Sequence, residues 1–289
     1  MDGIVLIDKP EGITSTAVVR TVKALLRCKV GHLGTLDPFA SGLLPLVVGE
    51  GTKIAQFLNT ADKSYSGVIR LGSRTDTGDR TGTVVEEKPF PRSPAPERCA
   101  QIAAEFRGQR QQVPPMYSAV KQAGVPLYKH ARRGIDVERA ARNVIIHSLI
   151  LERIAEDRIG IQVSCSKGTY VRVLAEEIAA ALGTVGHLEA LRREGFGRFR
   201  LEDGISLPTT PEMLAKALLS PREALADLAE VEVTSEHAVQ IRQGRAAALR
   251  DLREPPSSDA VLKLVGPDGF LLAVVVASKG EWRFARVMC

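Results

Sequence analysis

One segment of the chain, residues 158–183, passes from a strand pattern directly into a helix pattern. Apolar side chains alternate with others along residues 158–165, which predicts a strand with one buried face. The alternating positions are Ile159, Ile161, Val163 and Cys165. The following sequence, GTYVRVLAEEIAAALG (168–183), predicts a helix. Tyr170 and Arg172 therefore fall where strand becomes helix, a place from which side chains often point into clefts.

Other strand and helix patterns precede this segment. Expected strands cover 3–8, 43–48, 63–71 and 144–154. Expected helices cover 15–27, with Ser15 or Thr16 as the cap, 52–59, with Thr52 as the cap, and a stretch that ends near Phe106 after a Pro-rich link, 88–96. Residues 72–82 predict a mobile polar loop. Its acids Asp76 and Asp79 lie three positions apart rather than two, so the spacing is not that of a calcium-binding loop.

The composition of the chain changes near residue 230. Beyond that point short strand patterns alternate with Gly, Pro and Asp turns, which predicts a small β-rich domain. From Val231 on, eight Lys and Arg stand against seven Asp and Glu, so this part is almost neutral.

Composition limits where such a chain works. The longest apolar run, residues 270–277, is far shorter than the roughly 20 residues of a membrane-spanning helix, and the N-terminus lacks signal-peptide features. We therefore expect a cytoplasmic protein with no membrane partner. Cys28, Cys99, Cys165 and Cys289 form no CxxC pair, so we expect them to be reduced and structural and to hold no metal.

Positive charge is concentrated in two places, although the net charge is only +5. Residues 121–142 hold six Lys and Arg, and RREGFGRFR (192–200) interleaves four arginines with two phenylalanines. The second pattern suits a nucleic-acid backbone with stacking surfaces, or equally a solvated face above core phenylalanines.

A single acid, Asp37, stands in the stretch GHLGTLDPFASGLLP (31–45) among three glycines, two prolines and a histidine. Asp followed by Pro begins many ordinary turns, because the Asp side chain bonds nearby amides and Pro presets φ. On these residues alone, a turn explains Asp37 better than chemistry does.

The longer stretch GHLGTLDPFASGLLPLVVGEGTK (31–53) resembles the signature of the bacterial TruB-type tRNA pseudouridine synthases nearly position by position. Further segments agree in order and spacing: GIVLIDKPEGITS, KSYSGVIRLGSRTDTGD, VPPMYSAVKQAGVPLYKHARRG, and CSKGTYVRVLAEEIAAALG followed by HLEALRR. Together they cover roughly residues 3–200. The tail is similar, by pattern only, to the small PUA-type RNA-binding barrel.

The resemblance implies an α+β fold with a central mixed β-sheet flanked by helices and loops. It implies a catalytic domain over 1–230, with an RNA-binding insertion at about 106–142, and a PUA-like barrel over 231–289. It also implies a monomer that isomerises the T-loop uridine at position 55 of tRNA to pseudouridine after flipping the base out, with no cofactor, metal, guide RNA or obligate protein partner.

The same resemblance assigns the site. Asp37 would act on the sugar, either as nucleophile or as base for a ribose proton, and both roles stay open. Arg172 would pair with Asp37, and Tyr65 would stack on the uracil with its hydroxyl near C5. The remaining expected residues are His32 beside the flipped base, Tyr170 and Leu191 as pocket walls, Lys9, Pro10 and Lys53 as supports, and Lys121, Arg132 and Arg133 as phosphate contacts.

Two other interpretations remain. Related archaeal and eukaryotic synthases work inside guide-RNA particles and also carry a C-terminal PUA domain, but this chain has the basic insertion and the RTDTGD loop of the stand-alone type. The second interpretation is a non-enzymatic module that binds or folds RNA. The presence of Asp37, Tyr65 and Arg172 argues against a chain that has only lost catalysis.

Overall fold

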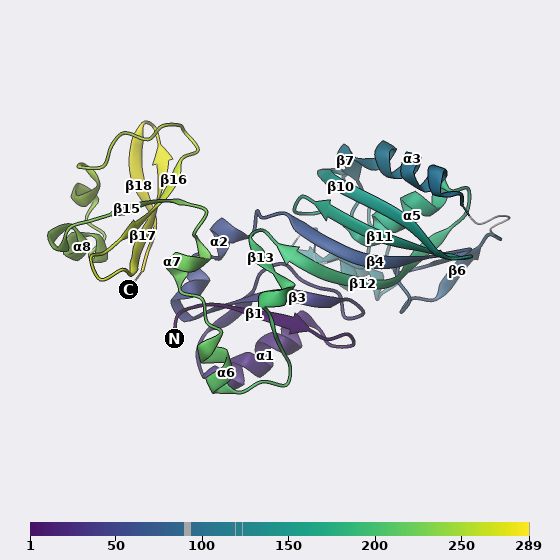
Figure 1. Ribbon diagram of the computed structural model, residues 1–289, viewed down its shortest axis with the longest axis horizontal. Helices are drawn as coiled ribbons and strands as arrows, with labels where there is room; N and C mark the ends of the chain where they lie inside the picture. Colours follow the sequence, from purple (N-terminus) through teal and green to yellow (C-terminus); the bar gives the residue numbers. More distant parts are fainter. Residues whose placement is uncertain (90–93, 119, 123, 289) are drawn as a thin grey trace.

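The computed structural model describes residues 1–89, 94–118, 120–122 and 124–288 (Figure 1). Part of the Pro-rich link and Cys289 therefore lie outside the described residues. Ten strands form one sheet, whose main path runs β14-β1-β3-β12-β4-β11-β10-β7, with β2 paired to β3 and β13 to β12. Parallel pairs (β1 with β14, β3 with β12) occur among antiparallel ones, so the expected mixed sheet and α+β class are confirmed.

The strands of this sheet are β1 (Gly3–Lys9), β2 (Val30–His32), β3 (Ser41–Val48), β4 (Lys63–Leu71), β7 (Gly108–Gln112), β10 (Arg142–Ala155), β11 (Arg158–Cys165), β12 (Gly186–Phe196), β13 (Phe199–Arg200) and β14 (Ile205–Ser206). The helices beside it are α1 (Ser15–Leu26), α2 (Ala55–Leu58), α3 (Pro96–Phe106), α5 (Val171–Ala181), α6 (Pro211–Lys216) and α7 (Pro221–Ala224). The expected strands and most expected helices are confirmed, whereas β12 was not foreseen.

One face of the sheet is covered by α1, α3 and α5. The alternating residues of β11 point to this face and are at most 3% exposed. They share one apolar cluster with Val18 of α1, Ile102 of α3 and Ile178 of α5. Helices α3 and α5 lie over the β10–β12 part of the sheet, with α1 below β1 and β3 (Figure 1). Burial of this shared face is the main favourable contribution to folding.

The two halves of the sheet meet through a short contact between β3 and β12. Only Ser41 and Gly42 pair there with Arg192 and Arg193. Gly42 has φ +102°, and a Cβ at this position would lie 2.4 Å from the carbonyl oxygen of Arg193. A side chain at residue 42 would therefore push the strands apart, because this φ disfavours L residues and the backbones are too close.

Several local expectations were wrong. The cap of α1 is Thr14, whose hydroxyl accepts from Ala17 N, because Ser15 is instead buried against the loop before Asp37. Thr52 caps no helix. It sits in a 3₁₀ turn (Gly49–Lys53) and donates to Gly49 O, and α2 begins only at Ala55. Strand β7, which falls within the expected insertion (about 106–142), pairs with β10 and so belongs to the large sheet.

The C-terminal part forms a second sheet of β15 (Ala229–Glu232), β16 (Val261–Val265), β17 (Leu271–Ser278) and β18 (Glu281–Val287), beside helix α8 (Ser235–Arg242). Among the described residues this sheet is open, with β15 and β18 as its edges, so the expected barrel is not closed. Closed or nearly closed small barrels use about five to eight strands, more than the four here.

The C-terminal sheet packs against the larger one. Leu271, Val274 and Met288 belong to the same apolar cluster as Ile4 and Leu6 of β1. In Figure 1 the small sheet lies beside α7 and α2 at one end of the molecule. In the part of the chain that the structure describes, no helix is long and apolar enough to cross a bilayer.

Candidate active site

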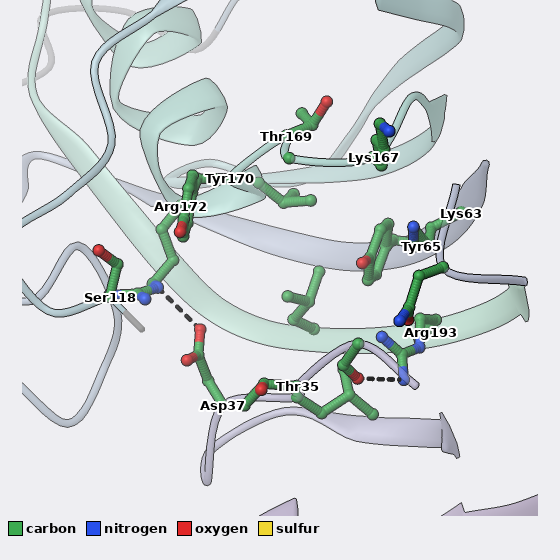
Figure 2. A pocket seen from close by; sticks show the side chains of 16 residues that line it. Thr35, Asp37, Lys63, Tyr65, Ser118, Lys167, Thr169, Tyr170, Arg172 and Arg193 are labelled. Carbon is green, nitrogen blue, oxygen red and sulfur yellow. Dashed lines mark hydrogen bonds and ion pairs between the residues drawn. The ribbon is translucent and has the colours of Figure 1, made fainter. Parts of the chain in front are cut away.

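A cavity of about 320 Å³ lies where the halves of the large sheet meet (Figure 2). Five chain segments line it: the loop that carries Asp37, residues 59–65 with Tyr65 on β4, the segment at Ser118, the β11–α5 junction with Tyr170 and Arg172, and β12 with Leu191 and Arg193. Five of the expected residues, Asp37, Tyr65, Tyr170, Arg172 and Leu191, are therefore brought together from distant parts of the sequence.

The loop before β3 is held in place from both sides. The Ser15 hydroxyl donates to the carbonyl of Leu36 and accepts from its amide, each at 2.9 Å. Ala40 N donates to Asp37 O at 3.1 Å, so the Asp-Pro turn does form. The Asp37 side chain, however, is 36% exposed and faces the cavity, so the turn and the site use different atoms of the same residue.

The guanidinium of Arg172 is fixed by all three of its nitrogens. Nε lies 2.9 Å from Asp37 Oδ2. Nη1 donates to Thr77 O at 2.7 Å, and Nη2 donates to Tyr117 O at 2.8 Å. The Arg172 side chain is only 4% exposed. A buried guanidinium with every nitrogen engaged has one orientation, so Asp37 meets a fixed positive charge.

A second carboxylate that sequence reasoning missed, Asp79, lies behind Arg172. Its Oδ2 is 3.9 Å from Arg172 Nη1, and its Oδ1 accepts from the Thr77 hydroxyl at 3.0 Å and Thr81 N at 2.9 Å. Asp79 is only 5% exposed. The loop expected to be mobile is thus anchored through its own acid. The Asp and Thr residues of RTDTGD were visible in the sequence, but only the fold places them against Arg172.

The charge on Asp37 is balanced between opposing effects. Burial raises the pKa of this carboxyl above its usual range, the Arg172 charge lowers it, and the neighbouring Asp79 raises it again. The pKa of Asp37 is raised overall, and the Arg172 contact opposes this rise by favouring the ionised form.

Tyr65 on β4 is half-buried and lines the cavity beside Arg193. Burial raises the pKa of the Tyr65 phenol, and the charge of Arg193 and a hydrogen bond with it act in the opposite direction. Arg193 itself is 1% exposed and donates to Leu43 O at 2.6 Å and Gly34 O at 3.1 Å. It therefore ties the Asp37 loop and β3 to β12, a role that the basic composition of 192–200 did not predict.

The residues expected to support the site, Lys9, Pro10 and Lys53, differ in where they lie relative to the cavity. Lys9 is fully buried, and its Nζ donates to Pro10 O at 2.8 Å and Ile13 O at 3.0 Å, while Gly12 N donates to Pro38 O. Burial lowers the pKa of Lys9 to about 8. Lys9 and the exposed Pro10 thus brace the turn below the Asp37 loop. Lys53 is not among the cavity-lining residues: its Nζ pairs with Glu50 and donates to Val287 O at 3.1 Å.

Tyr170 and Leu191 form walls of the cavity. The side chain of Gln112 accepts from Tyr170 N at 2.7 Å and donates to Tyr170 O at 3.2 Å, which fixes the start of α5. His32 lies on β2, outside the cavity lining, and burial lowers its pKa.

The expected phosphate contacts lie on the insertion, away from the cavity. Lys121, Arg132 and Arg133 are all exposed, and Arg132 also lies over the Tyr128 ring, 5.5 Å from its centroid. In the 192–200 segment, Phe196 and Phe199 are at most 4% exposed and belong to the core, as the second interpretation of that segment required. Among the residues described, no group of three or more His, Cys, Asp or Glu could hold a metal ion.

Comparison with known proteins matches the chain to one family. Residues 22–171 match the family model described as TruB family pseudouridylate synthase (N terminal domain). The chain is 43% identical over 288 residues to tRNA pseudouridine synthase B of Azoarcus sp. (strain BH72), a match that covers 98% of this chain and 92% of that protein. The chain belongs to the TruB family of pseudouridylate synthases. It is also 41% identical over 292 residues to tRNA pseudouridine synthase B of Geobacter sulfurreducens, with 98% and 95% covered.

Solved structures support the fold of this TruB family member. A chain of a Cbf5-Nop10-Gar1 complex superposes with a TM-score of 0.73 at 23% identity, covering 99% of this chain and 85% of that one. A chain from an H/ACA RNP bound to a substrate RNA gives a TM-score of 0.72 at 21% identity, with the same coverage. At these identities the similarity shows a shared fold.

Proposed function

We propose that this chain isomerises the T-loop uridine at position 55 of tRNA to pseudouridine, as a stand-alone enzyme. The main support is the ion pair between the half-buried Asp37 and the fixed, buried Arg172, in a cavity that Tyr65 also lines. The same chain shares 43% identity with a protein named tRNA pseudouridine synthase B.

The geometry suits a rearrangement at one sugar. The bond from ribose C1′ to uracil N1 breaks, the base turns, and C1′ bonds to C5. The proton leaves C5, and N1 ends with a proton, so the product has the mass of the substrate. An ionised Asp37 can attack C1′ or remove a ribose proton, and Arg172 stabilises the carboxylate for either role.

Binding requires the uridine to leave the T-loop stack. Flipping a base costs a few kcal/mol, which contacts to the rest of the RNA must offset. The Tyr65 ring offers the flipped uracil a stacking surface, and Leu191 offers an apolar wall. The exposed cations Lys121, Arg132 and Arg133 of the insertion supply phosphate contacts that position the stem-loop.

The test is reaction of the purified chain with an unmodified tRNA transcript, without added protein or guide RNA. Carbodiimide labelling and primer extension then map pseudouridine. We expect one labelled position, in the T-loop, and none in a matched transcript with cytidine there. Absence of label at that position would refute the proposal, and label that needs an added guide RNA would favour the guide-dependent alternative.

A further inference from the structure

The active-site cavity has two ends of different charge (Figure 2). At one end Arg172 is paired with Asp37, which is the single acid among the described residues that line the cavity. At the other end Lys63 and Arg193 lie beside Tyr65, with Lys167 at the rim. This second end therefore gathers positive charge that the lining itself does not neutralise.

The cations at this end differ in what they can still bind. Arg193 is 1% exposed and is engaged with the carbonyls of Leu43 and Gly34. Lys63 is half-buried; its Nζ donates to Ala61 O and lies 4.6 Å from the centroid of the Phe196 ring. An ammonium group has three N–H donors, so Lys63 keeps donors available for a ligand in the cavity.

The surroundings of Lys63 favour an arriving anion. Burial, together with the charges of Arg193 and Lys167, lowers the pKa of Lys63 to about 8, while Cys165 and Asp62 act in the opposite direction. Asp62 lies outside the cavity lining and is itself 3.1 Å from His147 Nε2. A half-buried ammonium group near other cations is stabilised when a negative charge comes within hydrogen-bonding distance.

We propose that Lys63 binds a backbone phosphate adjacent to the flipped uridine, so that the cavity holds a nucleotide between Asp37 and a phosphate subsite. This inference rests on the proposed function, because it assumes that RNA occupies the cavity. Uracil is neutral and offers only carbonyl oxygens to a lysine. The phosphate on either side of the nucleotide carries the negative charge that would balance the cations at this end.

The test combines a protein change with an RNA change. Binding of a T stem-loop RNA is measured for the wild type and Lys63→Met, with a normal phosphate or an uncharged methylphosphonate on the 5′ or the 3′ side of the target uridine. We expect one of these replacements to weaken wild-type binding roughly tenfold or more. The same replacement should have little further effect in Lys63→Met.

The control for loss of charge is Lys23→Met, because Lys23 is exposed on α1 outside the cavity lining. This variant should respond to the methylphosphonates as the wild type does. Lys63→Gln, which keeps a polar side chain, repeats the comparison if Lys63→Met unfolds at a lower temperature. The inference would be overturned if, at both linkages, the methylphosphonate weakened binding by the same factor in Lys63→Met as in the wild type. It would also be overturned if neither methylphosphonate weakened binding to the wild type.

The proposed function is tested separately by pseudouridine formation in the wild type on the unmodified stem-loop. If the wild type is active but the protein and RNA changes weaken binding independently, the phosphate subsite alone is overturned. An inactive wild type overturns the proposed function, while the binding comparison still decides whether Lys63 contacts a phosphate.

Discussion

Arg172 Nε lies 2.9 Å from Asp37 Oδ2, while the other two nitrogens of the same guanidinium are held by the carbonyls of Thr77 and Tyr117. The arginine would therefore keep its position if Asp37 lost its charge. This separates the chemistry of the carboxylate from the architecture around it, and it makes substitutions of Asp37 interpretable.

Asp37→Asn should abolish pseudouridine formation and leave tRNA affinity within a few fold. The amide is nearly isosteric but can neither attack C1′ nor accept a ribose proton as a carboxylate does. Single-turnover assays and filter binding measure the two effects. Because burial already disfavours the charged form of Asp37, the melting temperature should not fall. Substantial residual turnover would remove Asp37 from its assigned role.

Tyr65→Phe should impair the chemical step far more than binding. The ring that stacks on the base remains, while the hydroxyl beside Arg193 is lost. The comparison is the single-turnover rate constant against the dissociation constant for tRNA. A wild-type single-turnover rate constant in the variant would reduce Tyr65 to a stacking or packing residue.

Activity should decline in acid at a pH above the range expected of an ordinary aspartate. The pKa of Asp37 is raised by burial, and the ionised form is the active one, so activity is lost as pH falls through this raised value. For stability the sign is opposite, because a folded-state pKa above the unfolded one means that ionised Asp37 costs folding free energy as pH rises. Profiles of kcat/KM and of melting temperature against pH measure both. A kcat/KM profile that stays flat down to about pH 4 would contradict this assignment.

Neutralising Arg132 and Arg133 together should weaken tRNA binding and flatten its salt dependence by roughly one to two counterions, because phosphate contacts release condensed ions. The matched control is Arg132→Lys with Arg133→Lys, which keeps both charges and should keep the slope. The measurement is the logarithm of the binding constant against the logarithm of salt concentration. An unchanged slope in the neutral variant would place the RNA elsewhere.

Removing residues 231–289 should leave turnover at saturating tRNA but weaken affinity, because every residue assigned to chemistry precedes the deletion. The structure adds a cost in stability. The deletion would remove Leu271, Val274 and Met288 from the apolar cluster that also holds Ile4 and Leu6 of β1, so the melting temperature should fall and apolar dye binding should rise. Loss of turnover in a folded truncated protein would show that the C-terminal part takes part in catalysis.

The sequence alone was enough for the main strands and helices, because alternation and helical periodicity are local. It also pointed to Asp37, Tyr65 and Arg172, since each stands in a motif that resembles one family. The helix caps and the turn at Thr52 were misjudged, because Ser15 and Thr52 make their hydrogen bonds to carbonyls of the folded chain rather than to a helix end.

The surroundings of the Asp37 carboxylate depend on the tertiary structure. Arg193 bonds Gly34 across 159 positions, and Arg172 bonds Thr77 across 95, distances over which no local pattern carries information. The burial of Asp79 beside Arg172 and the cationic end at Lys63 likewise bring together residues that are distant in the sequence. The resemblance implied a C-terminal barrel, yet the described strands form an open sheet that shares an apolar cluster with β1, because apolar side chains specify burial but not their partner.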